Sequence, residues 1–174
     1  MSGDAHGDTT HEVYHTGLRN MHALEMTAIE LTERQVERME NYPEMAERLR
    51  AHRDESQAQA QRLEAILARH GTTPSTVKNA AMGVMGNVAA ALHAPAPDEI
   101  LKNTFANFAF EHQEIAGYTS LLAMADLLGD TESVAPLRQS LAEEQSMAKF
   151  IEERIVPTTQ KFMTLTAQGA KAGI

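Results

Sequence analysis

Apolar residues recur at alternating three- and four-residue steps through four long stretches of this chain, and the two-residue alternation of β-strands is nearly absent. Such steps follow one face of an α-helix. The pattern predicts helices over about 12–40, 43–70, 98–128 and 133–156. Each stretch is followed by residues that stop helices, namely Asn41-Tyr42-Pro43, Gly71, Gly129-Asp130 and Pro157. The predicted fold is therefore all-α.

The lengths of the connections predict how these helices are arranged. A few residues join the first helix to the second and the third to the fourth, so each pair should form an antiparallel hairpin. The connection between the hairpins, from Gly71 to Pro97, is long and contains an apolar segment, 77–94, which we expect to be an extra helix. Two hairpins joined by one long crossover have the connectivity of a ferritin-like four-helix bundle.

The predicted elements divide the chain into three parts. A bundle over 12–157 is preceded by a flexible N-terminus, 1–11, and followed by a C-terminal tail, 158–174. We expect the end of the tail, 169–174, to be mobile because it is short and lies beyond the last helix.

Composition narrows the possible partners. The chain has 174 residues, a formal net charge of −9 and no cysteine, and its length is that of one domain. An acidic chain does not attract nucleic acid or anionic lipid, so we expect neither as a partner. The N-terminus lacks the pattern of a secretory signal, and polar residues interrupt the most apolar segment, so we predict neither export nor a membrane span. Together with the lack of cysteine, these features favour the cytoplasm.

Several glutamates occupy positions where a soluble helix normally carries apolar residues. Glu25 and Glu144 lie on the apolar stripes of the first and fourth helices. The third helix is apolar on nearly all sides, and Glu111 and Glu114 share one of its faces. On the second helix, Glu55 lies about 80° from the centre of the stripe, at the edge of the inward face.

These five glutamates come from all four helices and can converge inside the bundle. Two carboxylates about 4 Å apart repel by about 4 kcal/mol at an effective dielectric constant of about 20. An unneutralised cluster would therefore cost more than the ~5–15 kcal/mol by which a domain is stable. The inward faces carry no Lys or Arg, so protons or cations must neutralise the cluster. Without metal, some of these carboxyls should have pKa values well above the usual ~4.3.

Three other residues lie near the carboxylate faces. His52 and Gln59 are on the apolar stripe of the second helix, and Tyr118 follows Glu114 by one turn. His52 is interpreted as a metal ligand, as a donor that supports a ligand, or as a core histidine. Tyr118 is interpreted as a donor of a hydrogen bond or an electron, or as a packed core residue.

Two further features are interpreted as solvated surface. Glu143 lies about 100° round the fourth helix from its inward neighbour and should face solvent. Histidines near the N-terminus suggest metal scavenging, but residues spread along a fraying helix end are mostly solvated. They are His6, His11, His15 and His22.

Four motifs resemble one known family. They are the segment from Gly17 to Glu25, the segment from His52 to Leu63, Glu111-His112-Gln113-Glu114 with Gly117-Tyr118, and Leu141-Ala142-Glu143-Glu144. Over about 13–155 the chain is similar to the YciE/YciF-like group of ferritin-like proteins, and the third motif is the most specific. The resemblance implies a rubrerythrin-like four-helix bundle, often dimeric, with a dinuclear carboxylate site and a link to stress.

The resemblance also implies a ligand set. Two Fe or Mn ions would be held by Glu25, Glu55, Glu111, Glu114 and Glu144, with His52, Gln59 and Tyr118 beside them. Ferritins and rubrerythrins place a histidine three residues after the second-helix glutamate. Here that position is Ala58, and the equivalent position in the fourth helix is Met147. A site poor in nitrogen ligands is therefore expected.

The function expected from these features is dinuclear metal binding, with ferroxidase or peroxide-reducing activity and with dioxygen or peroxide as the oxidant. The alternative is a non-enzymatic, stress-related interaction or scaffold protein whose metal is structural or absent. No catalytic residue is assigned. A second apolar face on the third helix, with Phe105 and Leu127, predicts a homodimer.

Overall fold

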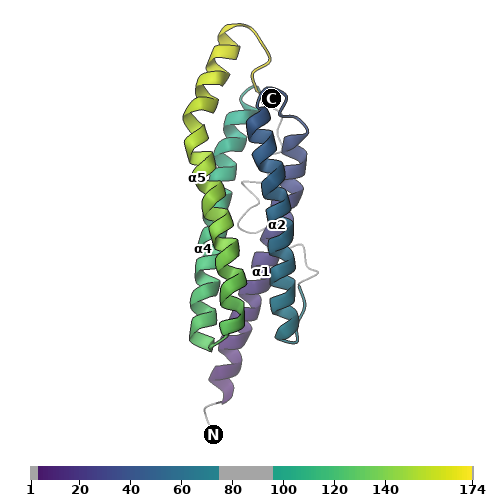
Figure 1. The fold of residues 1–174 in the computed structure, drawn as a ribbon, viewed down its shortest axis with the longest axis vertical. Coiled ribbons are helices and arrows are strands. Elements are labelled where there is room, and N and C mark those ends of the chain that lie inside the picture. Colours follow the sequence, from purple (N-terminus) through teal and green to yellow (C-terminus); the bar gives the residue numbers. More distant parts are fainter. Residues whose placement is uncertain (1–3, 75–95, 174) are drawn as a thin grey trace.

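The computed structural model describes residues 4–74 and 96–173. Within them the chain forms long α-helices and no strand. The helices are α1 (Asp4–Val36), α2 (Pro43–Arg69), α4 (Glu99–Leu128) and α5 (Thr131–Ala167). Figure 1 shows them side by side in one elongated bundle. The prediction of an all-α four-helix bundle is confirmed, and the predicted extra helix over 77–94 lies outside the described residues.

The helices pack as two hairpins laid against each other. α1 contacts α2 and α4 contacts α5, while the hairpins meet through α1 against α4 and α2 against α5. Asn107 of α4 is hydrogen-bonded to Gln35, near the end of α1, and Tyr118 further along α4 is bonded to Glu25, earlier in α1. α4 therefore runs antiparallel to α1. Each helix has two neighbours and turns one side toward the common axis.

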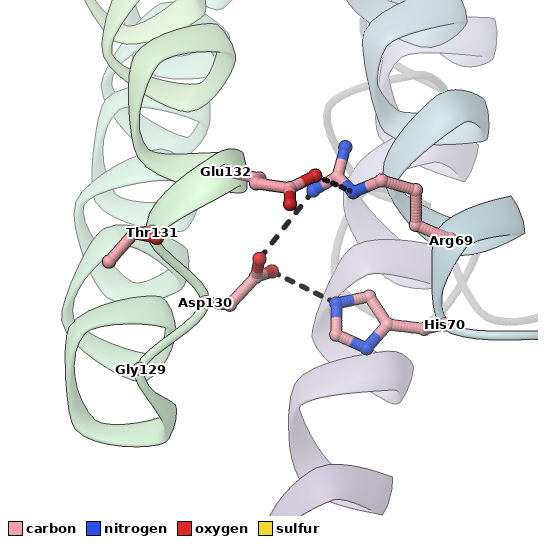
Figure 2. A pocket seen from close by; sticks show the side chains of 6 residues that line it. All are labelled: Arg69, His70, Gly129, Asp130, Thr131 and Glu132. Carbon is pink, nitrogen blue, oxygen red and sulfur yellow. Dashed lines mark hydrogen bonds and ion pairs between the residues drawn. The ribbon is translucent and has the colours of Figure 1, made fainter.

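Local chemistry accounts for several helix ends. Pro43 begins α2, where the missing N–H sacrifices no helical hydrogen bond. Gly129 ends α4 at a φ of 70°, a left-handed conformation that strains other residues. Beside this turn lies a pocket of about 370 Å³, lined by Arg69, His70 and 129–132 (Figure 2). No helix of the described segments is both long and apolar enough to cross a bilayer.

The last helix is longer than predicted. α5 does not stop at Pro157 but continues to Ala167. A proline inside a helix removes a backbone hydrogen bond and costs about 3 kcal/mol. The continuation buries Thr158 and packs Phe162 against the apolar cluster that contains Ile151. Packing therefore overrides the local stop signal, and the predicted end of this helix is wrong.

The end of the chain is docked rather than mobile over 171–173. The Tyr42 hydroxyl donates a hydrogen bond to the Ala172 carbonyl oxygen (2.8 Å), and the Ile100 N–H donates to the Gly173 carbonyl oxygen (2.9 Å). A Cβ at Gly173 would lie 2.5 Å from the carbonyl oxygen of Pro97, so this close approach requires glycine. The segment after α5 is thereby tied to the start of α4.

The core consists of two apolar clusters with a polar layer between them. Leu63 of α2 belongs to one cluster, with Tyr14 and Leu18 of α1, and Leu49 of α2 belongs to the other. The α2 residues between these two leucines include three buried polar side chains, His52, Ser56 and Gln59. The polar layer is therefore shielded from water along the bundle axis by apolar side chains.

Candidate metal centre

Side chains from all four helices meet in the polar layer. They are Glu25 of α1, His52 of α2, Glu111 and Glu114 of α4 and Glu144 of α5, and all are buried. One ligand atom from each of His52, Glu111, Glu114 and Glu144 lies within 4.8 Å of the others. The structure therefore brings three of the five predicted glutamates within this distance of His52, which the sequence offered as a possible ligand, and it buries a fourth, Glu25, in the same layer.

His52 reaches into this group from α2. Its Nε2 lies 3.3 Å from Glu111 Oε2 and 3.6 Å from Glu144 Oε2, and its Nδ1 lies 2.9 Å from Glu55 Oε2. Burial lowers the pKa of His52, but the three carboxylates, Glu111 foremost, outweigh burial and hold the pKa well above its ordinary value. The protonated imidazole therefore supplies positive charge to the cluster when no metal does.

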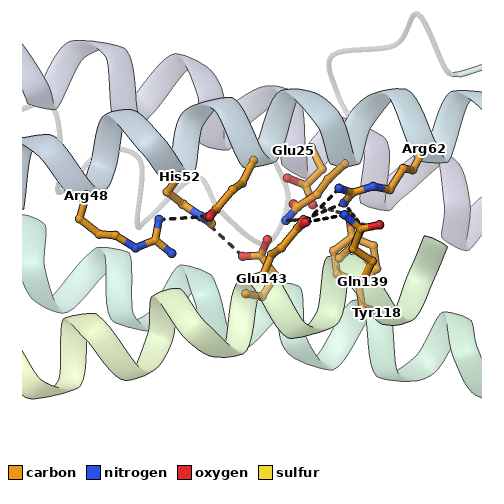
Figure 3. Close-up of polar contacts among 11 residues, drawn as sticks. Glu25, Arg48, His52, Arg62, Tyr118, Gln139 and Glu143 are labelled. Carbon is orange, nitrogen blue, oxygen red and sulfur yellow. Dashed lines mark hydrogen bonds and ion pairs between the residues drawn. The ribbon is translucent and has the colours of Figure 1, made fainter. Parts of the chain in front are cut away.

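Glu55 lies beside the group rather than within it. Its side chain is 33% exposed, and Arg48 Nη1 donates a hydrogen bond to its Oε2 (3.0 Å). Burial raises the pKa of Glu55, but His52 and Arg48 outweigh burial and hold it below its ordinary value. Arg48 and His52 both contact Glu55 Oε2, and Figure 3 shows the Arg48 side chain extending toward His52. Glu55 is thus placed to orient His52, and its role as a metal ligand stays a prediction.

Glu25 is held by Tyr118. The Tyr118 hydroxyl donates a hydrogen bond of 2.6 Å to Glu25 Oε1, and both side chains are buried (Figure 3). Burial raises the pKa of Glu25 to about 8, although the bond from Tyr118 acts in the opposite direction. Of the interpretations of Tyr118, the structure supports its role as a hydrogen-bond donor.

Most carboxylate oxygens of the cluster lack hydrogen-bond donors. Among the described residues, both oxygens of Glu114 and of Glu144, one oxygen of Glu25 and one of Glu111 are buried without a partner. Burial raises the pKa of Glu144 to about 9 against the attraction of His52, and raises the pKa of Glu114 well above its ordinary value with help from neighbouring carboxylates. The expectation that some carboxyls titrate high thus agrees with the structure.

The unpartnered oxygens fit a metal. Buried polar atoms in proteins are nearly always paired. In this layer the unpartnered atoms are mostly carboxylate oxygens, together with His52 Nε2, Ser56 Oγ and Gln59 Oε1. Oxygen donors with a single imidazole suit hard divalent cations such as Mn²⁺ and Fe²⁺. The group is poor in nitrogen, as expected, because Ala58 and Met147 leave His52 as its one histidine.

Glu143 is not the solvated surface residue that the sequence predicted. Arg62 donates two hydrogen bonds to its carboxylate (2.7 and 2.9 Å), and Gln59 Nε2 donates a third (3.0 Å). Its side chain is only 20% exposed. Burial raises the pKa of Glu143, but these donors outweigh burial and lower it. Gln59 therefore joins α2 to α5 through Glu143, and Figure 3 shows Arg62 approaching the same carboxylate.

Fold and site together define the class of this protein: a four-helix bundle with carboxylates and one histidine converging in its core. The chain belongs to the family described as Domain of unknown function (DUF892), whose model matches residues 9–164. This confirms the predicted YciE/YciF-like family.

Solved structures of similar fold cover nearly the whole chain. A protein from Xanthomonas campestris matches with a TM-score of 0.77 and 24% identity, over 91% of this chain and 99% of its own. YcfI from Rhodopseudomonas palustris, for which a structural role has been suggested, matches with a TM-score of 0.73 and 26% identity, over 87% and 97%. The Escherichia coli stress protein YciF matches with a TM-score of 0.76 and 17% identity, over 87% and 98%.

Proposed function

We propose that this protein binds two Fe or Mn ions in the polar layer and reacts there with dioxygen or peroxide as a ferroxidase or peroxide reductase. The observation that supports this most strongly is the set of buried carboxylate oxygens without hydrogen-bond partners among the described residues. Within the described part of the chain, no Lys or Arg forms an ion pair with these four buried glutamates, Glu25, Glu111, Glu114 and Glu144. A pair of divalent cations would supply the missing charge.

The surrounding residues support such a site in different ways. Glu111, Glu114 and Glu144 would hold the ions, with Glu25 and His52 completing the set, and bound Fe or Mn would supply the electrons for reducing the oxidant. Glu55 fixes the orientation of His52 through Nδ1, so that Nε2 faces the carboxylates. A carboxylate that holds the outer nitrogen of a ligating imidazole also raises its basicity.

The proposal is tested by anaerobic titration of the metal-free protein with Fe(II), followed by addition of oxygen. We expect about two Fe(II) per chain and a rise in ferric absorbance that is faster than in buffer alone. Glu144→Gln should abolish this acceleration, whereas Glu153→Gln, at an exposed position of the same helix, should retain it. Absence of Fe(II) and Mn(II) binding would overturn the proposal.

A second candidate is a stress-related scaffold whose metal is structural or absent. It is favoured by the raised pKa values of Glu25 (about 8) and Glu144 (about 9). Protons can therefore neutralise part of the cluster without any metal. Binding of Fe(II) without faster oxidation in the experiment above would favour a structural metal, and no binding would favour the metal-free scaffold.

With either function, we propose that the protein is a homodimer in the cytoplasm. Support for the dimer comes from the outward face of α4, where Phe105 is 51% exposed and Leu127 is 85% exposed. Exposed alanines lie between them on the same face, namely Ala109, Ala116 and Ala123. Small residues allow a second helix to approach closely, and the large apolar residues provide the area to bury.

A further inference from the structure

A group of three histidines lies at the end of the bundle where α2 ends, apart from the carboxylate cluster. His11 and His15 are one turn apart on α1, and His70 follows the last residue of α2. The ring centroids of His15 and His70 are 5.0 Å apart, and those of His11 and His15 are 6.3 Å apart. His70 and His52 are about 27 Å apart along α2, from 18 residues at about 1.5 Å each. This histidine group is therefore separate from the carboxylate cluster.

His70 is oriented by a carboxylate. Its Nε2 lies 2.9 Å from Asp130 Oδ2, as Figure 2 shows, and Asp130 also accepts hydrogen bonds from Tyr14 (3.0 Å) and Ser133. Burial raises the pKa of Asp130, but these donors outweigh burial and lower it to about 2. A histidine held by a carboxylate on one ring nitrogen presents the other, here Nδ1, for coordination.

His15 has an unused nitrogen. Its side chain is 12% exposed, and its Nε2 is buried without a hydrogen-bond partner among the described residues. Burial lowers the pKa of His15, and the neighbouring His70 lowers it further. A buried imidazole nitrogen without a hydrogen-bond partner is an atom that a metal ion can bind.

The spacing of the His15 and His70 rings matches a shared metal ion. Two imidazoles on one tetrahedral zinc, each with a Zn–N distance of about 2.0–2.1 Å, place their ring centroids about 5 Å apart. The segment His11-Glu12-Val13-Tyr14-His15 also has the H-E-x-x-H spacing, which puts two histidines on one helix face for zinc. His22 does not belong to this group because its Nε2 is bonded to Glu64 (2.9 Å).

We propose that His11, His15 and His70 form a second metal site, which binds Zn²⁺ through three imidazoles and leaves the fourth position to water or Glu12. Imidazole ligands favour zinc over the hard ions that suit a carboxylate cluster. The two sites of one bundle would then select different metals.

The test is Zn²⁺ binding to metal-free protein, measured by competition with a chromophoric chelator. We expect His15→Gln and His70→Gln each to weaken the binding of one Zn²⁺ per chain by more than about tenfold. Loss of a residue that only orients a ligand already lowers metal affinity by about 10- to 100-fold, and loss of a ligand should lower it at least as much. His112→Gln, at an exposed position of α4, and Glu144→Gln should keep that ion.

A thermal melt distinguishes loss of the site from loss of folding. His11 is exposed, so His11→Gln should leave the melting temperature of the metal-free protein unchanged and reduce the increase that Zn²⁺ produces. Two results would overturn the proposal: zinc binding in His15→Gln and His70→Gln equal to that in His112→Gln, or loss of the zinc ion in Glu144→Gln instead.

Discussion

At the scale of single residues, the centre of the bundle is shaped by the cost of burying charge. His52 and Glu55 of α2 lie in different surroundings. The histidine is buried among the carboxylates, and the glutamate lies at the edge of the cluster, where Arg48 donates a hydrogen bond to it. On α5, Glu144 is fully buried without donors, while its neighbour Glu143 is bound by Arg62. Adjacent residues of the same type thus have opposite pKa shifts because their donors differ.

Glu144→Gln tests the metal centre directly. The pKa of Glu144 is about 9, so glutamine imitates its protonated form, and the metal-free variant should melt near the parent at neutral pH. Metal at a hundredfold excess over its dissociation constant adds about 2.7 kcal/mol to a folded state that alone binds it. We expect Mn²⁺ or anaerobic Fe²⁺ to raise the melting temperature of the parent and of Glu153→Gln, and to raise that of Glu144→Gln much less. Equal shifts in all three proteins would contradict this assignment.

Helical periodicity was sufficient to identify the inward carboxylates but not their partners. Glu25, Glu111, Glu114 and Glu144 were found because a step of about 100° per residue places them on buried faces. The same geometry wrongly predicted that Glu143 faces solvent, because a helical wheel describes one helix and does not include Arg62 of the neighbouring helix. The choice between Glu55 and His52 depends on side-chain reach, which residue spacing does not specify.

At the scale of elements, the sequence did not predict the extents of α1 and α5: α1 runs from Asp4 to Val36 rather than over 12–40, and α5 continues past Pro157 to Ala167. Local signals identified the end of α4 at Gly129 and the start of α2 at Pro43, since these depend on φ and on missing donors. The end of α5 depends instead on long-range packing of Phe162 and on the docked segment 171–173. A rule based on proline alone cannot include those contacts.

Pro157→Ala should therefore stabilise the protein. The substitution restores a donor in the interior of α5, where proline costs up to about 3 kcal/mol, and we expect a gain in unfolding free energy of about 1–3 kcal/mol in chemical denaturation. Pro43→Ala is the matched control, since proline at the first position of a helix sacrifices no hydrogen bond, and it should give no gain. A Pro157→Ala variant with unchanged or lower stability would show that α5 gains nothing from continuity at this point.

At the scale of the whole molecule, the bundle is predicted to pair through α4. Sedimentation of the parent at micromolar concentration should give the mass of two chains. Phe105→Glu places a charge on the exposed apolar face and should shift the protein to a monomer. Val156→Glu, at a residue of α5 that is 61% exposed, should remain dimeric. A monomeric parent would refute the proposed interface.

The metal-free protein should lose stability as pH rises from 6.5 to 8.5. The pKa values of Glu25 (about 8) and Glu144 (about 9) are raised in the folded state. Between the ordinary carboxyl pKa and these values, the folded state holds protons that the unfolded state has released. For each such proton, the unfolding free energy falls by up to about 1.4 kcal/mol as the pH rises by one unit. His52, whose folded pKa is also raised, acts in the same direction.

Thermal melts of chelator-treated protein across this range provide the measurement. Groups with lowered pKa values affect the stability at lower pH. Asp130 and Glu143 titrate below this range, and His15 opposes the decrease in stability only up to about pH 6.5. The decrease should be shallower in Glu144→Gln, which has one fewer such carboxyl. A melting temperature that is constant or rises from pH 6.5 to 8.5 would contradict the predicted titration of the cluster.

The contribution of a residue from every helix to one buried cluster has a kinetic consequence. Glu25, His52, Glu111 and Glu144 are far apart in the chain, so their ligand atoms meet only when both hairpins are docked. Interactions that are absent from the folding transition state change the rate of unfolding and leave the rate of folding almost unaltered. A metal held at this point would therefore lengthen the lifetime of the native bundle without accelerating its formation, and removal of the metal would shorten that lifetime.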